Sequence, residues 1–147
     1  MTSPKESGTP GTINAGYWLV VLGSALGVVA TLYVLLNKQA LIDVSVQANK
    51  DPKITPEMVA STVNTILTVS VVVTLVIAAL AVWFAGKVRG GLKKSRTGLM
   101  ITLLLGLFFQ LLTNTLGVVT ALIAISGLVL FYFRQSSEYL TEREQLT

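Results

Sequence analysis

The chain has 147 residues, of which 52% are hydrophobic and 12% are charged. A soluble domain of this size carries about twice that charged fraction, so the composition indicates one small membrane domain and excludes a separate soluble one. The absence of Cys and His excludes disulfides, thiolate nucleophiles, imidazole proton relays and Cys/His metal sites, and the net charge of +4 is too localised for a nucleic-acid-binding face.

Residues 1–14 are polar and contain two Pro and two Gly. Such a segment cannot bury enough apolar surface to offset its ordering entropy, so we expect a disordered cytoplasmic tail. Residues 15–36 hold no charge and are long enough to cross a hydrocarbon core of about 30 Å as a first transmembrane helix. Tyr17 and Trp18 at its start are typical of an interfacial aromatic belt. The run is too long for a signal peptide, which favours an uncleaved anchor.

Residues 37–55 are predicted to form the main outer loop. Ile42, Val44 and Val46 alternate with polar residues, as in a short strand, but the same segment also fits a helical extension of the first span. Both alternatives stay open, because six residues are too few to establish a period. Residues 49–52 are predicted to form a turn.

The start of the second long helix is marked by three consecutive residues. Thr55 can cap the helix, Pro56 fits its first position, and Glu57 complements the positive end of the helix dipole. The helix is predicted to run to about Gly86, with its membrane part over residues 66–86. It is longer than the membrane is thick, so its polar beginning should lie outside.

Residues 87–96 form a predicted basic loop without an acid, and they hold five of the eleven Lys and Arg. Short basic loops stay on the cytoplasmic side of a membrane, so this segment predicts the orientation of the whole chain. It can also bind anionic lipid headgroups. The topological role is the more common one. The five basic residues are Lys87, Arg89, Lys93, Lys94 and Arg96.

The remaining apolar sequence predicts a tight helical hairpin with short spans at residues 98–112 and 117–133. Asn114 and Thr115 break the run between the two spans. Residues 135–147 form a polar cytoplasmic tail, with a turn or two of helix at the membrane surface. The predicted fold is therefore all-α, a bundle of four transmembrane helices in a multi-pass protein of the plasma membrane, with both termini cytoplasmic.

Each span carries small or weakly polar residues at helical spacing. Helices in lipid associate through close backbone approach and interhelical hydrogen bonds, so these faces predict helix packing, within the chain or against a partner. Gly and Ala are also common in membrane helices for no special reason. The candidate packing residues are Gly23, Gly27, Ser70, Thr74, Ala78, Thr102, Gly106, Gln110, Gly117, Ala121 and Ala124.

Gln110 and Asn114 are the most polar residues at membrane depth in the second half of the chain. A charged and enclosed polar face marks a substrate path, but these side chains are neutral. We expect them to form structural hydrogen bonds, with Ser70, Thr68 or Asn64 as partners on the second span.

No Asp, Glu, Lys or Arg lies inside a predicted span. Proton-coupled transport normally needs an intramembrane acid, so this chain is not expected to be such a transporter. Three acids on the outer side, Asp43, Asp51 and Glu57, could meet and support an enzyme, but solvated loop acids are far more common. We expect no catalytic residues, no cofactor and no metal.

Several short motifs are similar to those of a group of small, mostly uncharacterised four-span membrane proteins of actinobacteria. This group often has Trp in the basic turn, where the present chain has Leu92 or Leu99. The resemblance implies a location in a bacterial plasma membrane and brings no site residues with it. The motifs are Tyr17-Trp18, Thr55-Pro56-Glu57 with Val63-Asn64, Arg89-Gly90 to Arg96-Thr97-Gly98, and residues 131–137.

These patterns favour a non-enzymatic accessory or scaffold protein that packs against a larger membrane complex or against itself. The alternative is a small homo-oligomeric transporter or channel, with Thr and Gln faces along its path.

Overall fold

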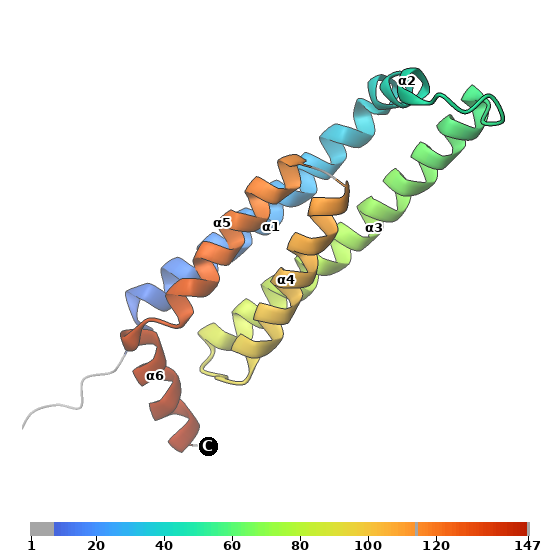
Figure 1. Cartoon of the computed structure of the whole chain (residues 1–147). Coiled ribbons are helices and arrows are strands. Elements are labelled where there is room, and N and C mark those ends of the chain that lie inside the picture. Colours follow the sequence, from blue (N-terminus) through green and yellow to red (C-terminus); the bar gives the residue numbers. More distant parts are fainter. Residues whose placement is uncertain (1–7, 114, 147) are drawn as a thin grey trace, which may run out of the picture.

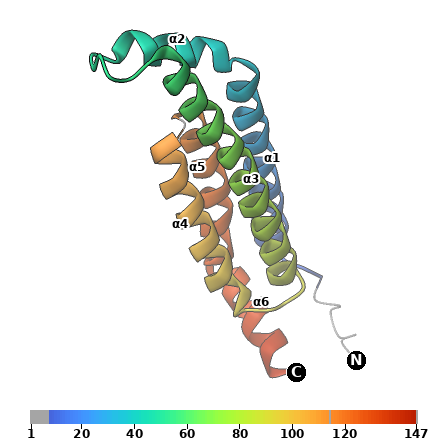
Figure 2. The same cartoon turned by 90° about the vertical axis from the view of Figure 1, so that its right-hand side faces the viewer.

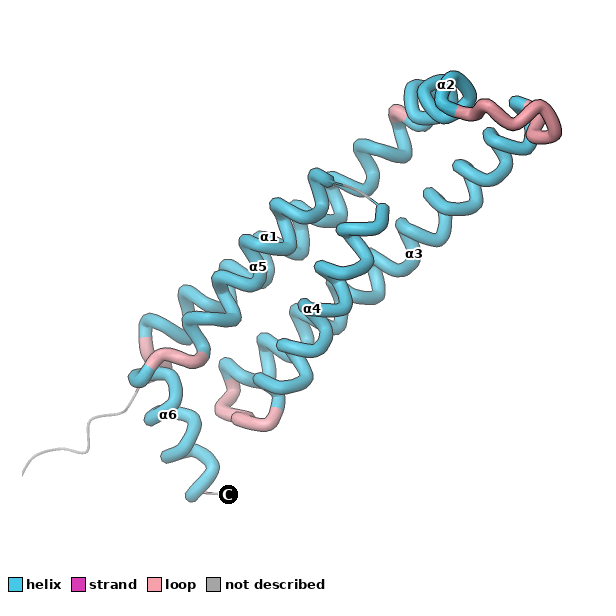
Figure 3. Tube along the Cα trace, viewed as in Figure 1, coloured by secondary structure: helices cyan, strands magenta, loops and turns pink. Residues whose placement is uncertain are grey.

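The computed structural model describes residues 8–113 and 115–146 of the chain. Within these residues the fold is all-α, as predicted, and short loops join the helices (Figures 1 and 3). The helices are α1 (Gly11–Leu36), α2 (Lys38–Ala48), α3 (Pro56–Arg89), α4 (Ser95–Thr113), α5 (Thr115–Phe131) and α6 (Arg134–Gln145).

Four of these helices form the bundle. Neighbours around it are α1 with α3, α3 with α4, α4 with α5, and α5 with α1, so each long helix touches two others (Figures 1 and 2). The core between them is apolar and is densest in the half nearest α6, where it includes Val20, Ala81, Leu99, Leu128 and Phe131.

The helix lengths match a membrane. Helices α1, α3 and α4 are each long and apolar enough to cross one, whereas the 17 residues of α5 reach that length only together with α6, across a bend of 62°. The 19 residues of α4 span about 28 Å, close to a hydrocarbon core, and the 34 residues of α3 span about 51 Å. Helix α3 therefore extends well past the α4–α5 hairpin, beside the end of α1 and below α2 (Figure 1).

The lateral surface of the bundle is apolar. Leu22, Val72, Leu105 and Leu122, one from each long helix, are all more than half exposed. Soluble monomers rarely expose apolar patches larger than a few hundred Å², whereas lipid solvates such a surface without cost. Fold and surface together give the architecture of a polytopic membrane protein.

The two ends of α3 follow from local chemistry. At its start, the predicted cap forms, because the Met58 N–H donates to Thr55 Oγ1 at 3.2 Å. At its end, the Leu92 N–H donates to the Lys87 carbonyl and the Gly91 N–H to the Val88 carbonyl, both at 3.0 Å. This is a Schellman motif, and Gly91 adopts the φ of +101° that it requires.

The predicted outer loop 37–55 is mostly helical, which decides between the two alternatives left open by its sequence. Helix α2 occupies residues 38–48 and no strand forms there. The break from α1 lies at Asn37, whose side-chain Nδ2 donates to the Tyr33 carbonyl at 2.9 Å. Tertiary packing explains the helix, because Ile42 is buried against Val63 and Leu67 of α3.

A turn forms close to the predicted residues 49–52, but its backbone hydrogen bond lies two residues further on, from the Ile54 N–H to the Asp51 carbonyl at 3.2 Å. The Asn49 side chain accepts from the Asp51 N–H at 3.1 Å, and the Asp51 carboxylate accepts from the Lys53 N–H at 2.9 Å. Such side-chain-to-backbone bonds are typical of Asn and Asp in turns.

Several predicted boundaries are wrong at the ends of the bundle. Helix α1 already begins at Gly11, inside the predicted tail 1–14, and the basic loop 87–96 shrinks to residues 90–94 between α3 and α4. The tail 135–147 holds the 12-residue α6, longer than the turn or two expected. Burial explains the outer helical turns, because Ile13 and Leu140 have no exposed surface. Of the predicted break at Asn114 and Thr115, Asn114 lies outside the described residues and Thr115 is the first residue of α5, which ends at Phe131, two residues before the predicted end of this span.

Candidate functional site

The faces of small residues point into the bundle. Of the eleven candidate packing residues, nine are buried and two, Ala78 and Ala121, are half-buried. The packing they support is therefore between helices of this chain. The nine buried residues are Gly23, Gly27, Ser70, Thr74, Thr102, Gly106, Gln110, Gly117 and Ala124.

Helices α1 and α5 make the closest backbone approach. A Cβ added to Gly23 would lie 2.6 Å from the Ala124 backbone nitrogen, and one added to Gly16 would lie 2.8 Å from the Gly127 carbonyl oxygen. Real Cβ atoms essentially never come this close to backbone, so these positions require glycine. The approach lets two apolar helices associate by van der Waals contact in lipid.

On the opposite side of the bundle, the glycines of α4 receive large side chains of α3. A Cβ on Gly106 would lie 3.0 Å from Ile77 Cγ2, and one on Gly98 would lie 2.7 Å from the Phe84 ring. Thr102, between these two glycines, donates its hydroxyl to the Gly98 carbonyl at 2.8 Å. The Thr102 hydroxyl is thus satisfied within its own helix.

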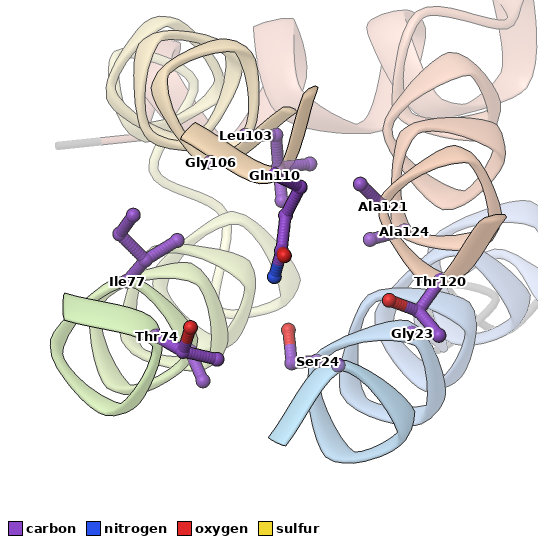
Figure 4. Close-up of a pocket in the computed structure, with 12 residues that line it drawn as sticks. Gly23, Ser24, Thr74, Ile77, Leu103, Gly106, Gln110, Thr120, Ala121 and Ala124 are labelled. Carbon is purple, nitrogen blue, oxygen red and sulfur yellow. The ribbon is translucent and has the colours of Figure 1, made fainter. Parts of the chain in front are cut away.

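A small cavity lies where all four long helices meet (Figure 4). Its volume is about 50 Å³, enough for a water molecule, whose share of liquid volume is about 30 Å³. It is too small for an organic substrate. Its lining contains the polar side chains of Ser24, Thr74, Gln110 and Thr120, and otherwise the small and apolar residues Gly23, Gly27, Ile77, Ala78, Leu103, Gly106, Ala121 and Ala124.

Gln110 is the most polar residue of this cavity. Its side chain projects from α4 toward Ser24 on α1 (Figure 4), and only 8% of the residue is exposed. Its amide makes no hydrogen bond to a described residue, but its atoms are not fully buried without a partner, as Asn14 Oδ1 and Ser70 Oγ are. The amide packs instead against the bare Cα of Gly117, in the space that a side chain there would fill.

The predicted partners of Gln110 lie elsewhere. Asn64 and Thr68 are exposed on the part of α3 beyond the hairpin, where Thr68 donates to the Asn64 carbonyl at 2.8 Å. The Ser70 hydroxyl is buried and has no hydrogen-bond partner among the described residues. Neither Asn64 nor Thr68 is therefore placed to bond Gln110, and Asn114 lies outside the described part of the chain.

Sequence reasoning missed three polar residues near the cavity. Thr31 is buried on α1, where its hydroxyl donates to the Gly27 carbonyl at 2.9 Å and lies 3.4 Å from the Thr74 hydroxyl. Ser24 and Thr120 line the cavity. The sequence indicates these residues only through their spacing, because Ser24 and Thr31 are seven residues apart and therefore on one helix face. Ser and Thr are too common in membrane helices for that signal to be read alone.

The five predicted basic residues divide into two groups. Three lie over aromatic rings: Lys87 Nζ is 3.7 Å from the Trp83 ring centre, and the guanidinium carbons of Arg89 and Arg96 are 5.0 and 4.5 Å from the Tyr17 and Tyr132 rings. Cations over aromatic faces gain about 0.5–1 kcal/mol at exposed sites. The other two, Lys93 and Lys94, are in the loop facing α6.

Helix α6 closes this end of the bundle. Arg96 Nη1 donates to the Phe131 carbonyl at 3.0 Å and to the Ser137 hydroxyl at 3.1 Å. Lys93 Nζ lies 3.5 Å from the Thr141 hydroxyl and 3.8 Å from the Glu144 carboxylate. The basic loop and the C-terminal helix thus hold each other in place.

One ion pair lies at the start of α6, outside the bundle. The Arg134 guanidinium donates to the Glu138 carboxylate at 2.8 Å, and this hydrogen bond together with the negative charge raises the pKa of Arg134 above its ordinary value. Both side chains are exposed, so the pair contributes little to stability.

The three acids predicted on the outer side are not gathered into one site. Asp43 and Glu57 line the same surface groove between α2 and α3, whereas Asp51 is on the loop and accepts from the Lys53 N–H. Among the described residues, no three acids come close enough together to hold a metal ion.

The fold and these sites define the class: a small all-α protein with three to four helices, among the described residues, able to cross a membrane, and a water-sized, mostly apolar cavity between them that four polar side chains line. Comparison of the chain with protein-family models, with curated proteins and with solved structures found no match.

Proposed function

We propose that this protein is a non-enzymatic accessory or scaffold protein of the plasma membrane, which associates with a larger membrane complex or with itself. One observation carries the proposal. Two helices lie outside the membrane-crossing bundle, α2 at one end and α6 at the other, while the bundle interior is filled by the chain's own side chains.

The contact surfaces in this proposal differ from those that the sequence suggested, because association is assigned to the ends of the bundle. The faces of small residues are used between the four helices and are not free for a partner. At the end bearing α2, Leu41, Val44, Ile54 and Met58 are at least 40% exposed beyond the long apolar stretches of α1 and α3. Exposed apolar residues next to polar ones are typical of protein contacts.

The orientation in this proposal has the α6 end in the cytoplasm. That end carries seven Lys and Arg and three Glu among the described residues, whereas the α2 end carries three Lys and three acids. The positive excess favours the cytoplasmic side, which also leaves both termini there.

Crosslinking in native membranes tests the proposal, and the absence of Cys from the chain makes single-Cys variants clean. A photo-crosslinker would be placed at V44C on α2, at E142C on α6, and at the lipid-facing control L105C. We expect adducts with protein from V44C or E142C and none from L105C. A monomer without adducts, or adducts from L105C alone, would overturn the proposal.

The alternative, a homo-oligomeric transporter or channel, draws support only from the polar side chains that line part of the cavity between the four long helices. Gln110 and Thr102 are buried within one protomer, so they cannot line a path between protomers without rearrangement. Toward α6 the cavity is followed by the apolar core around Leu99, Ala85 and Leu128. Liposome flux that is lost on Gln110→Leu substitution would favour this alternative.

A further inference from the structure

A second cavity lies at the α6 end of the bundle, between residues 90–94 and the C-terminal part of α6. Its volume is about 310 Å³, at the lower end of the range of about 300–1,000 Å³ in which ligand clefts fall. Figure 2 shows the α3–α4 loop and α6 together at this end of the bundle. The cavity is therefore formed by two segments that are about 50 residues apart in the sequence.

The described lining of this cavity has a net positive charge. Lys93 and Lys94 contribute from the loop and Arg143 from α6, and Glu144 is the one acid among the described lining residues. Glu144 lies 3.8 Å from Lys93, which leaves Lys94 and Arg143 as exposed cations at the cavity. Ammonium and guanidinium groups bind phosphate oxygens by charge-assisted hydrogen bonds.

The remaining cations of this end do not line the cavity. Lys87, Arg89 and Arg96 lie over Trp83, Tyr17 and Tyr132, and Arg134 pairs with Glu138. Such aromatic residues mark the level of the membrane interface. The loop follows Lys87 by about one helical turn, on the side away from the apolar surface. A loop in this position lies at the level expected for lipid phosphates, and the Leu92 side chain on it is exposed.

The loop is also fixed in shape. Gly91 has a φ of +101°, and the Arg143 side chain packs on it, with Cγ 3.0 Å from where a Cβ would lie. The Arg143 side chain also lies over the Tyr139 ring, at 5.5 Å from its centre. Arg143 is therefore positioned over the loop before any ligand binds, which reduces the entropy cost of binding.

From this arrangement we infer that the cavity binds the phosphate of an anionic lipid headgroup, with Lys94 and Arg143 as its main contacts. The site goes beyond the proposed function and would exist whatever the bundle associates with. The inference assigns the binding to these two cations in particular. A general electrostatic attraction to anionic membranes would involve all the cations at this end alike.

A pair of double variants with equal charge tests this distinction. K94Q/R143Q removes two cations from the cavity, and K87Q/R134Q removes two from the same end but outside it. Binding of phosphatidylglycerol to the full-length protein in neutral detergent would be measured by native mass spectrometry. Each cation near the surface contributes about fivefold to the affinity for an anionic lipid. We therefore expect K94Q/R143Q to bind phosphatidylglycerol about 25-fold more weakly, and K87Q/R134Q to bind it less than about fivefold more weakly.

A gain-of-function variant keeps the test decisive if the first variant folds poorly. E144Q removes the one acid of the cavity, so we expect phosphatidylglycerol to bind about fivefold more tightly. Phosphatidylcholine and glycerol 3-phosphate serve as further ligands, and neither should bind comparably.

Three results would overturn the inference. Equal losses in the two double variants would mean that only the overall charge matters. Unchanged or weaker binding by E144Q would show that phosphatidylglycerol does not bind in this cavity. Comparable binding of glycerol 3-phosphate would assign the site to a soluble phosphate rather than to a lipid.

Discussion

Gln110 is the residue whose environment is least expected for a membrane helix. It is 8% exposed, and its amide meets hydroxyl-bearing neighbours across a cavity of about 50 Å³ without a direct hydrogen bond to a described residue. A fully buried amide that lacks a partner costs about 1–3 kcal/mol, and the cost is at the low end of this range for Gln110, because its amide lines the cavity and is not fully buried. A water molecule in the cavity can offset part of that cost, since the lining offers Ser24, Thr74 and Thr120 as further partners.

The substitution Gln110→Met tests this account. Met has a similar length and no amide, so we expect the free energy of unfolding to rise by about 1 kcal/mol. Unfolding in mixed micelles, followed by circular dichroism, measures the difference. Thr102→Val is a suitable comparison, because the Thr102 hydroxyl is already bonded within its helix. A clear loss of stability in Gln110→Met would mean that the amide is well satisfied.

Among the contacts between helices, that of α1 with α5 depends most on glycine. A Cβ added to Gly16 or Gly23 of α1, or to Gly127 of α5, would lie under 3 Å from a backbone atom of the other helix. Backbone cannot move aside as a flexible side chain can, so even one methyl group must push the two helices apart.

Gly23→Ala is therefore expected to destabilise the bundle by about 1–3 kcal/mol, the usual cost of overpacking. Gly86→Ala is the matched control, because a Cβ there meets no atom within 4 Å. Ala is the better helix former, so the control should be neutral or should stabilise α3 by up to about 1 kcal/mol. Unfolding measurements on both variants separate the two effects. Equal changes in the free energy of unfolding for the two variants would show that the close approach of α1 and α5 does not contribute to stability.

The protein as a whole has a charged end and a nearly neutral end. The α6 end has an excess of four positive charges among the described residues, and the α2 end has none. The asymmetry is built from side chains that several separate segments bring to one end. This asymmetry favours one orientation in the membrane, because the positive charges all lie beyond the same end of the apolar surface.

Single-Cys labelling measures the orientation directly, since the chain has no native Cys. With a membrane-impermeant maleimide on intact cells, we expect K50C to react at once. S137C and K94C should react only after the membrane is permeabilised. Labelling of K94C in intact cells would reverse the orientation, and labelling of all three positions would contradict a membrane-crossing bundle.

The long apolar helices could be placed from the sequence alone, because the burial of about 20 uncharged residues in lipid is a large and local effect. The cap at Thr55 and a turn close to residues 49–52, displaced by two residues in the structure, could be predicted in the same way, since both depend on neighbouring residues only. The helical state of residues 38–48 and the extent of α6 could not, because they depend on tertiary packing of Ile42 and Leu140.

The partners of the small residues and of the basic residues follow from the three-dimensional arrangement of the helices. Lipid and protein interior are equally apolar, so the hydrophobic pattern of a membrane helix does not mark its buried side. Gly23 and Gly86 look alike in the sequence, yet one meets backbone and the other open space. Lys87 and Lys94 likewise differ only in what the fold places beside them: the ring of Trp83 for one, and the cavity under Arg143 for the other.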